Sequence, residues 1–314
     1  MSRLYLLFAL LALSPLFAIT EPCPGGFGVS GEWLYMLPSI DQPEFVIDSS
    51  SSSSPIGRRV ANEQSWHSGY RLESIYSFCN GENDVRIRWT HFPGFSESKT
   101  VTGSNLFGIL NHPASAFNGQ SGTASIDDEF HFFFLDALFG QRIVCDSRFS
   151  LLLQAGFQTG FLRLKEKVNY LGNSSSLRLK IRSKTWGIGP EVGLEGKYDL
   201  WRCLNFTGRF QGALLVSERN ARYQDELNGS SLIAEVKNEA YWNLIPTSDL
   251  KFGFSREWPC NCFNFDLEVG YEILTYYDGI QRIFFVDNSN TGSSFNENMT
   301  FTLQGPYVHA GIAF

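Results

Sequence analysis

Ten segments of this sequence have period-two alternation of apolar and polar side chains or a strong strand composition, and this pattern restricts the fold more than any other feature; 129–144 is aromatic on both faces, so its orientation is open. Successive side chains of a β-strand point to opposite faces, so each segment predicts a strand with one apolar and one polar face. Such alternation occurs in soluble sandwiches and in membrane barrels, so the connections must distinguish the two. The segments are 26–37, 68–78, 84–92, 129–144, 148–161, 177–200, 204–216, 241–254, 263–273 and 301–314.

Short and long connections alternate along the chain, with the connection at 172–176 as the one shorter exception. Simple up-and-down strands place all short turns at one end and all long loops at the other, which is typical of an outer-membrane barrel with periplasmic turns and external loops. We therefore predict an all-β fold, an antiparallel transmembrane β-barrel of about ten strands. Two further segments, 100–110 and 280–288, would allow twelve. The expected external loops are 38–67, 93–128, 217–240 and 274–300.

Both ends of the chain fit export to an outer membrane. Residues 1–18 combine Arg3, an apolar stretch and the small residue Ala18, which is the layout of a secretory signal peptide. A short transmembrane anchor is the alternative. Residues 19–314 would then form a single barrel domain. The last strand ends in YVHAGIAF, and we expect Phe314 to be an assembly signal read by the barrel assembly machinery.

The composition suits strands whose outer surface does not face water. Charged residues make up 18% and aromatic residues 15% of the chain, against a typical charged share of about 25%. No apolar run after the signal approaches the roughly 20 residues that a membrane helix needs. Removal of Arg3 with the signal peptide would change the net charge from −7 to −8. This acidity argues against nucleic acid as a partner.

We expect the polar faces of the strands to line a watery lumen and the apolar faces to contact outer-membrane lipid. The stretch LRLKIRSK (177–184) illustrates this expectation. Its apolar residues, predicted to face lipid, are Leu177, Leu179 and Ile181. Its basic residues, predicted to face the lumen or its mouth, are Arg178, Lys180, Arg182 and Lys184. The lumen-lining candidates are Arg86, Arg88, Arg178, Lys180, Arg182, Glu191, Glu195, Arg209, Asp249, Lys251, Asp266 and Glu268.

The cysteines all fall on the periplasmic side of this topology. An oxidising compartment permits disulfides, so they could pair across neighbouring turns or link the protein to other envelope proteins. Two of them, in Cys260-Asn261-Cys262, are too close together to bridge each other comfortably. This CxC has no second motif and no nearby His, so we predict no metal and no cofactor. The disulfide candidates are Cys23, Cys79, Cys145, Cys203, Cys260 and Cys262.

Four stretches carry a family resemblance: GEWLYMLPS, GYRLESIYSF, WGIGPEVGLEGKYDL and LQGPYVHAGIAF. Together they resemble the Legionella-type major outer membrane protein family, which also occurs in environmental relatives of the chlamydiae. The resemblance covers roughly residues 26–314, and WGIGPEVGL (186–194) is its most specific part. It implies a pore-forming β-barrel in the bacterial cell outer membrane. The six cysteines favour a chlamydia-related source, because major chlamydial porins are cysteine-linked. The tract Ser49–Ser54 departs from the family pattern.

The function that we expect is an outer-membrane porin for passive diffusion of small hydrophilic solutes and ions, because opposed rows of charge set ion preference. The alternative is a structural or adhesive surface protein with a nearly closed lumen, since small barrels are often filled by side chains. We expect no enzyme activity. The one external acidic–histidine cluster, Asp127-Asp128-Glu129 with His131, is weak evidence for catalysis, because a run of charges at the start of a strand is usually only solvated. Expected partners are outer-membrane lipid and the assembly machinery; a homo-oligomer and disulfide-linked envelope proteins are also considered.

Overall fold

The computed structural model describes residues 26–314 except 42, 80–81, 116, 147, 202–203, 230, 260–262 and 287–291. The signal peptide expected at 1–18 lies outside these residues and stays a prediction. No helix in the described part is long and apolar enough to cross a membrane. The elements are β1 (Gly26–Ile40), β2 (Glu44–Ser49), β3 (Gly57–Ala61), β4 (His67–Ser77), β5 (Asn83–Gly108), η1 (Pro113–Ser115), β6 (Gln120–Cys145), β7 (Phe149–Gly172), β8 (Ser176–Trp201), β9 (Leu204–Leu227), β10 (Ser231–Lys237), β11 (Tyr241–Pro259), β12 (Asn264–Phe285) and β13 (Ser294–Ala313).

Ten of the described strands form a closed antiparallel ring, in the order β1-β4-β5-β6-β7-β8-β9-β11-β12-β13. The last strand pairs back with the first, with Val308 opposite Trp33, and this closes the ring. A closed ring leaves no strand edge unpaired in lipid, which is the condition for crossing a membrane with strands. Each of the ten alternating segments supplies one ring strand. The predicted all-β antiparallel barrel is therefore confirmed.

Among the described residues, the ring contains ten strands and not twelve. Residues 100–108 continue β5, and residues 280–285 continue β12, so neither segment crosses the membrane a second time. The extension of β5 pairs with β6, and the extension of β12 pairs with β13. Both segments form β-structure, as their composition indicates. They lengthen β5 and β12 and do not add strands to the ring.

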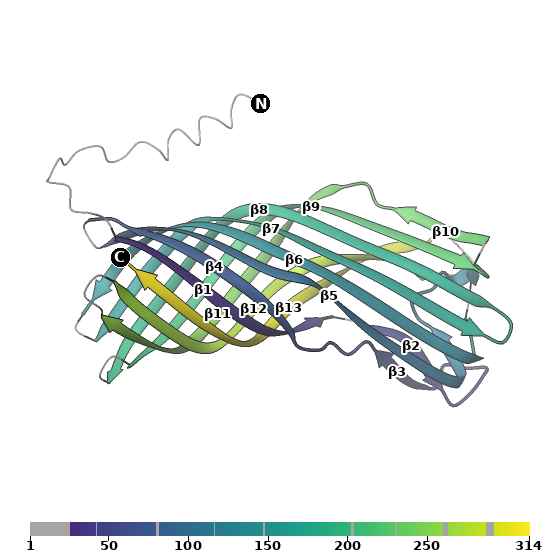
Figure 1. Cartoon of the computed structure of the whole chain (residues 1–314). Helices are drawn as coiled ribbons and strands as arrows, with labels where there is room; N and C mark the ends of the chain where they lie inside the picture. The colour runs from purple at the N-terminus through teal and green to yellow at the C-terminus, as the bar shows by residue number, and fades with distance from the viewer. Residues whose placement is uncertain are drawn as a thin grey trace, which may run out of the picture.

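Several ring strands are much longer than a membrane crossing requires. The strands β5, β6 and β8 contain 26 residues each. At about 3.3 Å per residue a strand of this length spans about 85 Å, against an apolar band about 25 Å tall. Much of the predicted long loops is therefore β-structure outside the membrane: 38–67 contains β2 and β3, and 217–240 contains β10. Figure 1 shows these short strands at the end opposite the C-terminus.

An apolar belt surrounds the half of the barrel nearest the short turns. Its outward side chains are large and strongly exposed; Val192, for example, is 62% exposed. Aromatic residues are frequent in this belt, as in the girdles at the interfaces of membrane barrels. Members of the belt include Phe27, Trp33, Leu72, Ile87, Phe139, Phe157, Trp186, Ile188, Phe210, Leu250, Phe254, Val269 and Ile312.

The prediction for LRLKIRSK is wrong in its orientation. Leu177, Leu179 and Ile181 are 1%, 0% and 2% exposed and point into the barrel, while the basic residues of the stretch lie on the outer wall. The outward face of β8 becomes apolar at Trp186 and remains so through Val192. The sequence interpretation assumed lipid contact for every apolar face. The part of β8 that precedes Trp186 lies outside the membrane. There the apolar face packs into the barrel and the charged face meets water.

The interior of the barrel consists of four stacked layers, and β6 contributes to each of them. Nearest the short turns is an ionic layer that includes Asp136, followed by a middle hydrophobic cluster that includes Phe132. A polar layer at Asp128 comes next, and an outer hydrophobic cluster around Ile126 occupies the mouth. Strand β7 repeats this order with Gln158, then leucines, then a glutamate and then a valine. The layers therefore follow the inward face of each strand from one end of the barrel to the other.

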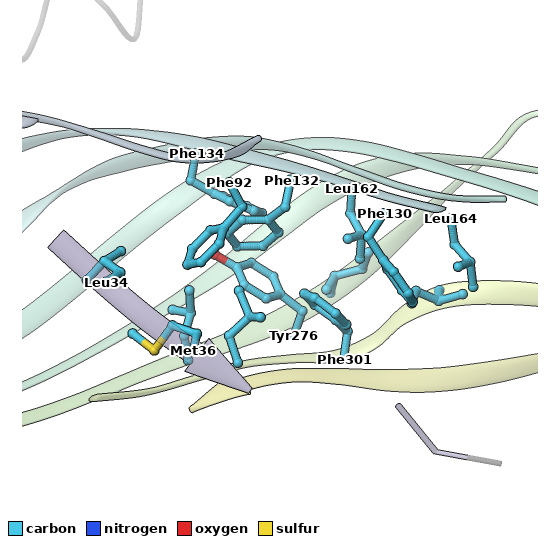
Figure 2. Close-up of a cluster of buried hydrophobic side chains, with 14 of the residues drawn as sticks. Leu34, Met36, Phe92, Phe130, Phe132, Phe134, Leu162, Leu164, Tyr276 and Phe301 are labelled. Atoms are coloured by element: carbon cyan, nitrogen blue, oxygen red, sulfur yellow. The ribbon is translucent and has the colours of Figure 1, made fainter. Parts of the chain in front are cut away.

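The middle hydrophobic cluster lies directly across the barrel axis (Figure 2). Aromatic rings from different strands meet in its centre. Phe132 and Tyr276 meet edge to face with centroids 5.3 Å apart, and Phe130 and Phe301 stack with centroids 5.8 Å apart. Burial of such apolar area is worth roughly 25 cal/mol per Å². The labelled members are Leu34, Met36, Phe92, Phe130, Phe132, Phe134, Leu162, Leu164, Tyr276 and Phe301.

Candidate functional site

Glu32 on β1 is a hub of the ionic layer, because three basic side chains contact its carboxylate. Its carboxylate accepts hydrogen bonds from Arg71 at 2.7 Å and from Lys251 at 2.6 Å, and His309 lies 3.2 Å away. The side chain of Glu32 is 3% exposed. These partners come from β4, β11 and β13, so one carboxylate connects four strands across the lumen. Charge-assisted bonds of this length are among the stronger hydrogen bonds in proteins.

Arg71 extends the network to β12, three strands away around the ring. Its guanidinium also contacts both carboxylate oxygens of Glu272 on β12, at 2.5 and 2.9 Å. Glu272 is fully buried, and Arg209 lies 3.7 Å from it. Arg209 in turn donates to Asp249 at 2.9 Å. A bidentate arginine–carboxylate pair fixes both orientation and distance, so this wall-to-wall bridge is rigid.

Arg88 forms a second bridge on the other side of the layer. It donates to Glu73 at 3.0 Å and to the amide oxygen of Gln211 at 2.7 Å, and Asp136 lies 3.8 Å away. Its side chain is 1% exposed. The side-chain amide of Gln211 in turn donates a hydrogen bond to the amide oxygen of Gln154 at 2.7 Å. All five side chains of this bridge are buried and lie against another polar side chain, so none of them is open to a wide aqueous channel.

A small vestibule opens below these bridges, toward the short turns. It has a volume of about 270 Å³ and includes Arg86, Glu195, Asp266 and His309 in its lining. Arg86 spans its wall, donating to Asp84 at 2.9 Å and to Glu195 at 3.0 Å. Charged groups of both signs line the vestibule, and it ends at the Glu32 hub. It is thus a recess at one end of the barrel.

The twelve lumen-lining candidates divide into two groups. Nine lie on the inward face of ring strands, in the ionic layer or the vestibule: Arg86, Arg88, Glu191, Glu195, Arg209, Asp249, Lys251, Asp266 and Glu268. Three lie on the outer wall, which corrects the prediction for β8: Arg178, Lys180 and Arg182. Whether the nine inward residues line a conducting path stays a prediction.

Several central members of the ionic layer were absent from the candidates. They occupy polar positions of alternating segments, so a complete reading of the inward parity would have found most of them. Asp136 is harder to identify, because its segment is aromatic on both faces. The missed residues are Glu32, Arg71, Glu73, Asp136 and Glu272.

The polar layer outside the membrane contains an unusual carboxyl group. Asp128 on β6 lies opposite Glu166 on β7 and accepts a hydrogen bond from Asn62 at 2.6 Å. Burial and the nearby charge of Glu166 raise the pKa of Asp128 to about 7, although Arg282 acts in the opposite direction. Arg282 itself pairs with Glu166 at 2.6 Å. Asp128 consequently gains a proton near neutral pH.

The acidic–histidine cluster does not converge on one point. Asp128 points into the barrel, whereas Asp127, Glu129 and His131 lie on the outer wall, as the alternation of a strand requires. Glu129 accepts from Lys165 at 2.6 Å and lies 2.8 Å from His131. These bonds lower the pKa of Glu129 to about 2. The outer residues thus form an exposed ion-pair group on the surface of the barrel.

The two described cysteines and the C-terminal residue lie at the end with the short turns. Cys79 follows β4 and Cys145 ends β6, while Cys23, Cys203, Cys260 and Cys262 lie outside the described residues. Disulfide formation therefore stays a prediction. Phe314 exchanges backbone hydrogen bonds with Phe27, at 2.8 and 3.2 Å, and its side chain is 67% exposed. It ends the seam that closes the ring, and its role as an assembly signal stays a prediction.

A closed antiparallel ring with an apolar belt and short turns at one end defines an outer-membrane β-barrel. The profile of the family described as "Legionella pneumophila major outer membrane protein precursor" matches residues 20–314. The chain belongs to this family, and its place is the bacterial outer membrane. The expectation from the sequence is confirmed in both respects; the chlamydia-related source stays a prediction.

Solved structures with a similar course of the chain share little sequence with it. The outer membrane protease OmpT from Escherichia coli is 10% identical, with a TM-score of 0.46 over 94% of this chain and 99% of that one. A Pseudomonas aeruginosa FadL homologue is 5% identical, with a TM-score of 0.29 over 92% and 90%. The translocator domain of the autotransporter NalP from Neisseria meningitidis is 9% identical, with a TM-score of 0.32 over 92% and 88%. Comparison with curated proteins gives no match.

Proposed function

We propose that this protein is a structural surface component of the outer membrane whose lumen is closed, rather than an open diffusion porin. The observation that carries the proposal is the stack of ionic and hydrophobic layers across the barrel axis. Arg88, Glu272 and Phe132 are each 0–1% exposed, although all three point into the lumen. An open channel would leave such side chains in contact with water. A nearly closed lumen is the alternative to the porin that the sequence also allows.

The polar vestibule favours the porin as the second candidate. It is lined by charged groups of both signs and reaches as far as Glu32. For ions to pass, the bridges of Arg71 and Arg88 and the middle hydrophobic cluster would all have to rearrange. A well-packed core changes between discrete arrangements and does not deform continuously. A pore of this kind would therefore open rarely and in steps.

Single-channel recording in a planar bilayer distinguishes the two candidates. The folded state is first verified by heat-modifiable gel migration, so that silence is not mistaken for unfolding. We expect no stable conductance steps from the folded protein. Stable steps at low voltage, with reproducible reversal potentials in a salt gradient, would contradict the closed lumen and support the porin.

We also propose that the protein has no hydrolytic role. The side chains of the cluster Asp127-Asp128-Glu129 and His131 are divided between the lumen and the outer wall, so they do not converge on one substrate. General acid–base catalysis needs groups within hydrogen-bond reach of one reacting site. A fluorogenic peptide assay with the folded protein tests this; turnover that His131→Ala abolishes would contradict it.

A further inference from the structure

The outer wall just beyond the apolar belt carries a strongly basic surface. It is formed by outward side chains of the neighbouring strands β7, β8 and β9, and we call it the basic patch. Four of its members, Arg178, Lys180, Arg182 and Lys184, are residues that the sequence predicts to face the lumen or its mouth. The basic patch consists of Arg163, Lys165, Lys167, Arg178, Lys180, Arg182, Lys184 and Arg222.

The strand register places like charges directly opposite one another in this patch. Between β7 and β8, Lys165 pairs with Arg182, and on either side Arg163 faces Lys184 and Lys167 faces Lys180. Between β8 and β9, Arg182 faces Arg222. Like charges at opposite positions of an antiparallel sheet are destabilising. Four such pairs on one face give an excess of positive charge that a bound anion would neutralise.

Acidic neighbours neutralise part of the patch. Lys165 donates to Glu129 at 2.6 Å, Lys180 donates to Glu226 at 3.3 Å, and Arg222 pairs with Glu235. Asp127 faces Lys167 in the register between β6 and β7. Among the described residues, five members have no ion pair with an acidic side chain: Arg163, Lys167, Arg178, Arg182 and Lys184. In the same part of the chain, the Nε atom of Arg163 is buried without a hydrogen-bond partner.

The patch contains a recess of about 310 Å³ that opens to the outside of the barrel. Basic side chains from three strands surround it, so a bound group could be contacted from several directions. Its lining includes Lys165, Lys167, Lys180, Arg182, Arg222 and Gln224.

The position of the patch relative to the apolar belt identifies the kind of anion. On β8, Lys184 and Trp186 are successive outward residues, so the wall changes from basic to apolar within one step. Trp186 and Ile188 are 44% and 46% exposed and continue the belt toward the short turns. A molecule that contacts both surfaces needs a charged head and apolar chains. The order of the two surfaces matches a lipid whose head faces the outside of the cell.

We propose that the basic patch binds the phosphate groups of a phosphorylated lipid of the outer leaflet. Arginine binds phosphate oxygens through two parallel hydrogen bonds, and lysine contributes a compact positive charge. In this arrangement Arg182 and the lysines around the recess hold the phosphate. The acyl chains lie along Trp186 and Ile188. The lipid thereby relieves the repulsion between the facing basic residues.

The test compares the wild-type protein with a charge-reversed variant in nanodiscs. The discs contain phosphatidylcholine and a titrated fraction of diphosphorylated lipid A, and bound lipid is counted by native mass spectrometry. Near a membrane surface each basic residue is worth about a fivefold change in binding of anionic lipid. For Arg182→Glu combined with Lys184→Glu we expect affinity to fall at least about 20-fold. Arg58→Glu with Arg59→Glu on β3 makes the same change of charge far from the belt, and we expect it to alter affinity less than twofold.

Further arms keep the test decisive. If the reversed variant does not fold, Lys167→Gln with Lys180→Gln removes two charges without introducing repulsive ones, and weaker binding is expected again. Dephosphorylated lipid A should bind the wild-type protein as weakly as diphosphorylated lipid A binds the variant. Equal lipid binding by wild type and variant would overturn the proposal. Tight binding of inorganic phosphate in discs without lipid A, with no gain from the lipid, would also overturn it.

Discussion

Buried charges determine how single residues behave in this barrel, and Arg88 is the clearest case. It is 1% exposed and bonded to Glu73 and Gln211. From the sequence, this residue appeared as a lumen charge that sets ion selectivity. In the structure it is a bridge between walls, so its substitution changes stability first. Removal of one partner of a buried pair leaves an uncompensated charge, which is costly in a region of low dielectric constant.

We expect Arg88→Met to destabilise the barrel by about 3–5 kcal/mol, because Glu73 loses its principal partner. Urea unfolding of the protein in lipid vesicles measures this change. Arg178→Met serves as the control: the side chain has a similar length but lies on the outer wall, and a change within about 0.5 kcal/mol is expected. Similar losses in both variants would show that the arginine stem, and not the buried bridge, is responsible.

Asp128 makes stability depend on pH. Its pKa is about 7 in the folded protein, against about 3.9 in an unfolded chain. Between these values the folded state binds more protons than the unfolded state, so stability falls as pH rises from about 4 to 7 and then levels off. We expect Asp128→Asn to remove this loss, which is on the order of 4 kcal/mol. Unfolding free energies at pH 5 and pH 8 test it; an identical pH slope in wild type and variant would contradict it.

At the level of elements, the short hairpin strands outside the ring are not equivalent. The hairpin of β2 and β3 inserts Phe45 and Val46, both 0% exposed, into the outer hydrophobic cluster. Tyr170 donates a hydrogen bond to the backbone oxygen of Phe45 from the facing wall. β10 instead extends β9 at the edge of the barrel, and its Leu232 is 54% exposed. One hairpin therefore closes the mouth, and the other lies outside it.

We expect Phe45→Ala to release the β2–β3 hairpin, because truncation of a buried phenylalanine costs about 3–5 kcal/mol. Limited proteolysis of the folded protein should then cut within residues 43–62 while the membrane-spanning ring remains intact. Leu232→Ala on β10 is the matched control, with no new cleavage expected. If the hairpin is still protected after Phe45→Ala, it does not depend on the outer hydrophobic cluster.

The whole molecule is a ring closed by its first and last strands, with a filled interior. The pairing of β1 with β13 begins where Gly28 lies opposite Ala313 and ends where Ile40 lies opposite Phe301. Above the apolar belt the same ring continues as a water-exposed cylinder filled by the outer hydrophobic cluster and the polar layer. The molecule thus combines a membrane barrel and an external domain in one set of strands. Both parts depend on the closure of the same seam.

We expect deletion of Phe314 to impair assembly into the outer membrane and to leave export intact. The deletion removes the residue that ends the closing strand and its two backbone bonds with Phe27. Fractionation, followed by heat-modifiable gel migration, measures the assembled share. Phe263→Ala, an exposed aromatic on the same end of the barrel, is the control. Normal membrane levels without Phe314 would contradict its role as an assembly signal.

The sequence by itself determined the ring: ten alternating segments, each long enough to cross a membrane, have few other ways to bury an apolar face. It also determined which end carries the short turns, because connection lengths are a property of the chain. The sequence did not determine which face of a strand points inward beyond the membrane. Leu177 and Ile188 are both apolar, yet one packs in the lumen and the other lies in the belt.

Only the tertiary structure decided those orientations, because what an apolar face contacts depends on the height of the strand relative to the membrane. The same holds for the lumen. Alternation places Arg88 and Glu272 on the inward side, but whether they line water or bind partners across the axis depends on the distance between opposite walls. In a barrel of ten strands that distance is short enough for side chains to meet. The closed interior is therefore a consequence of ring size and side-chain length together.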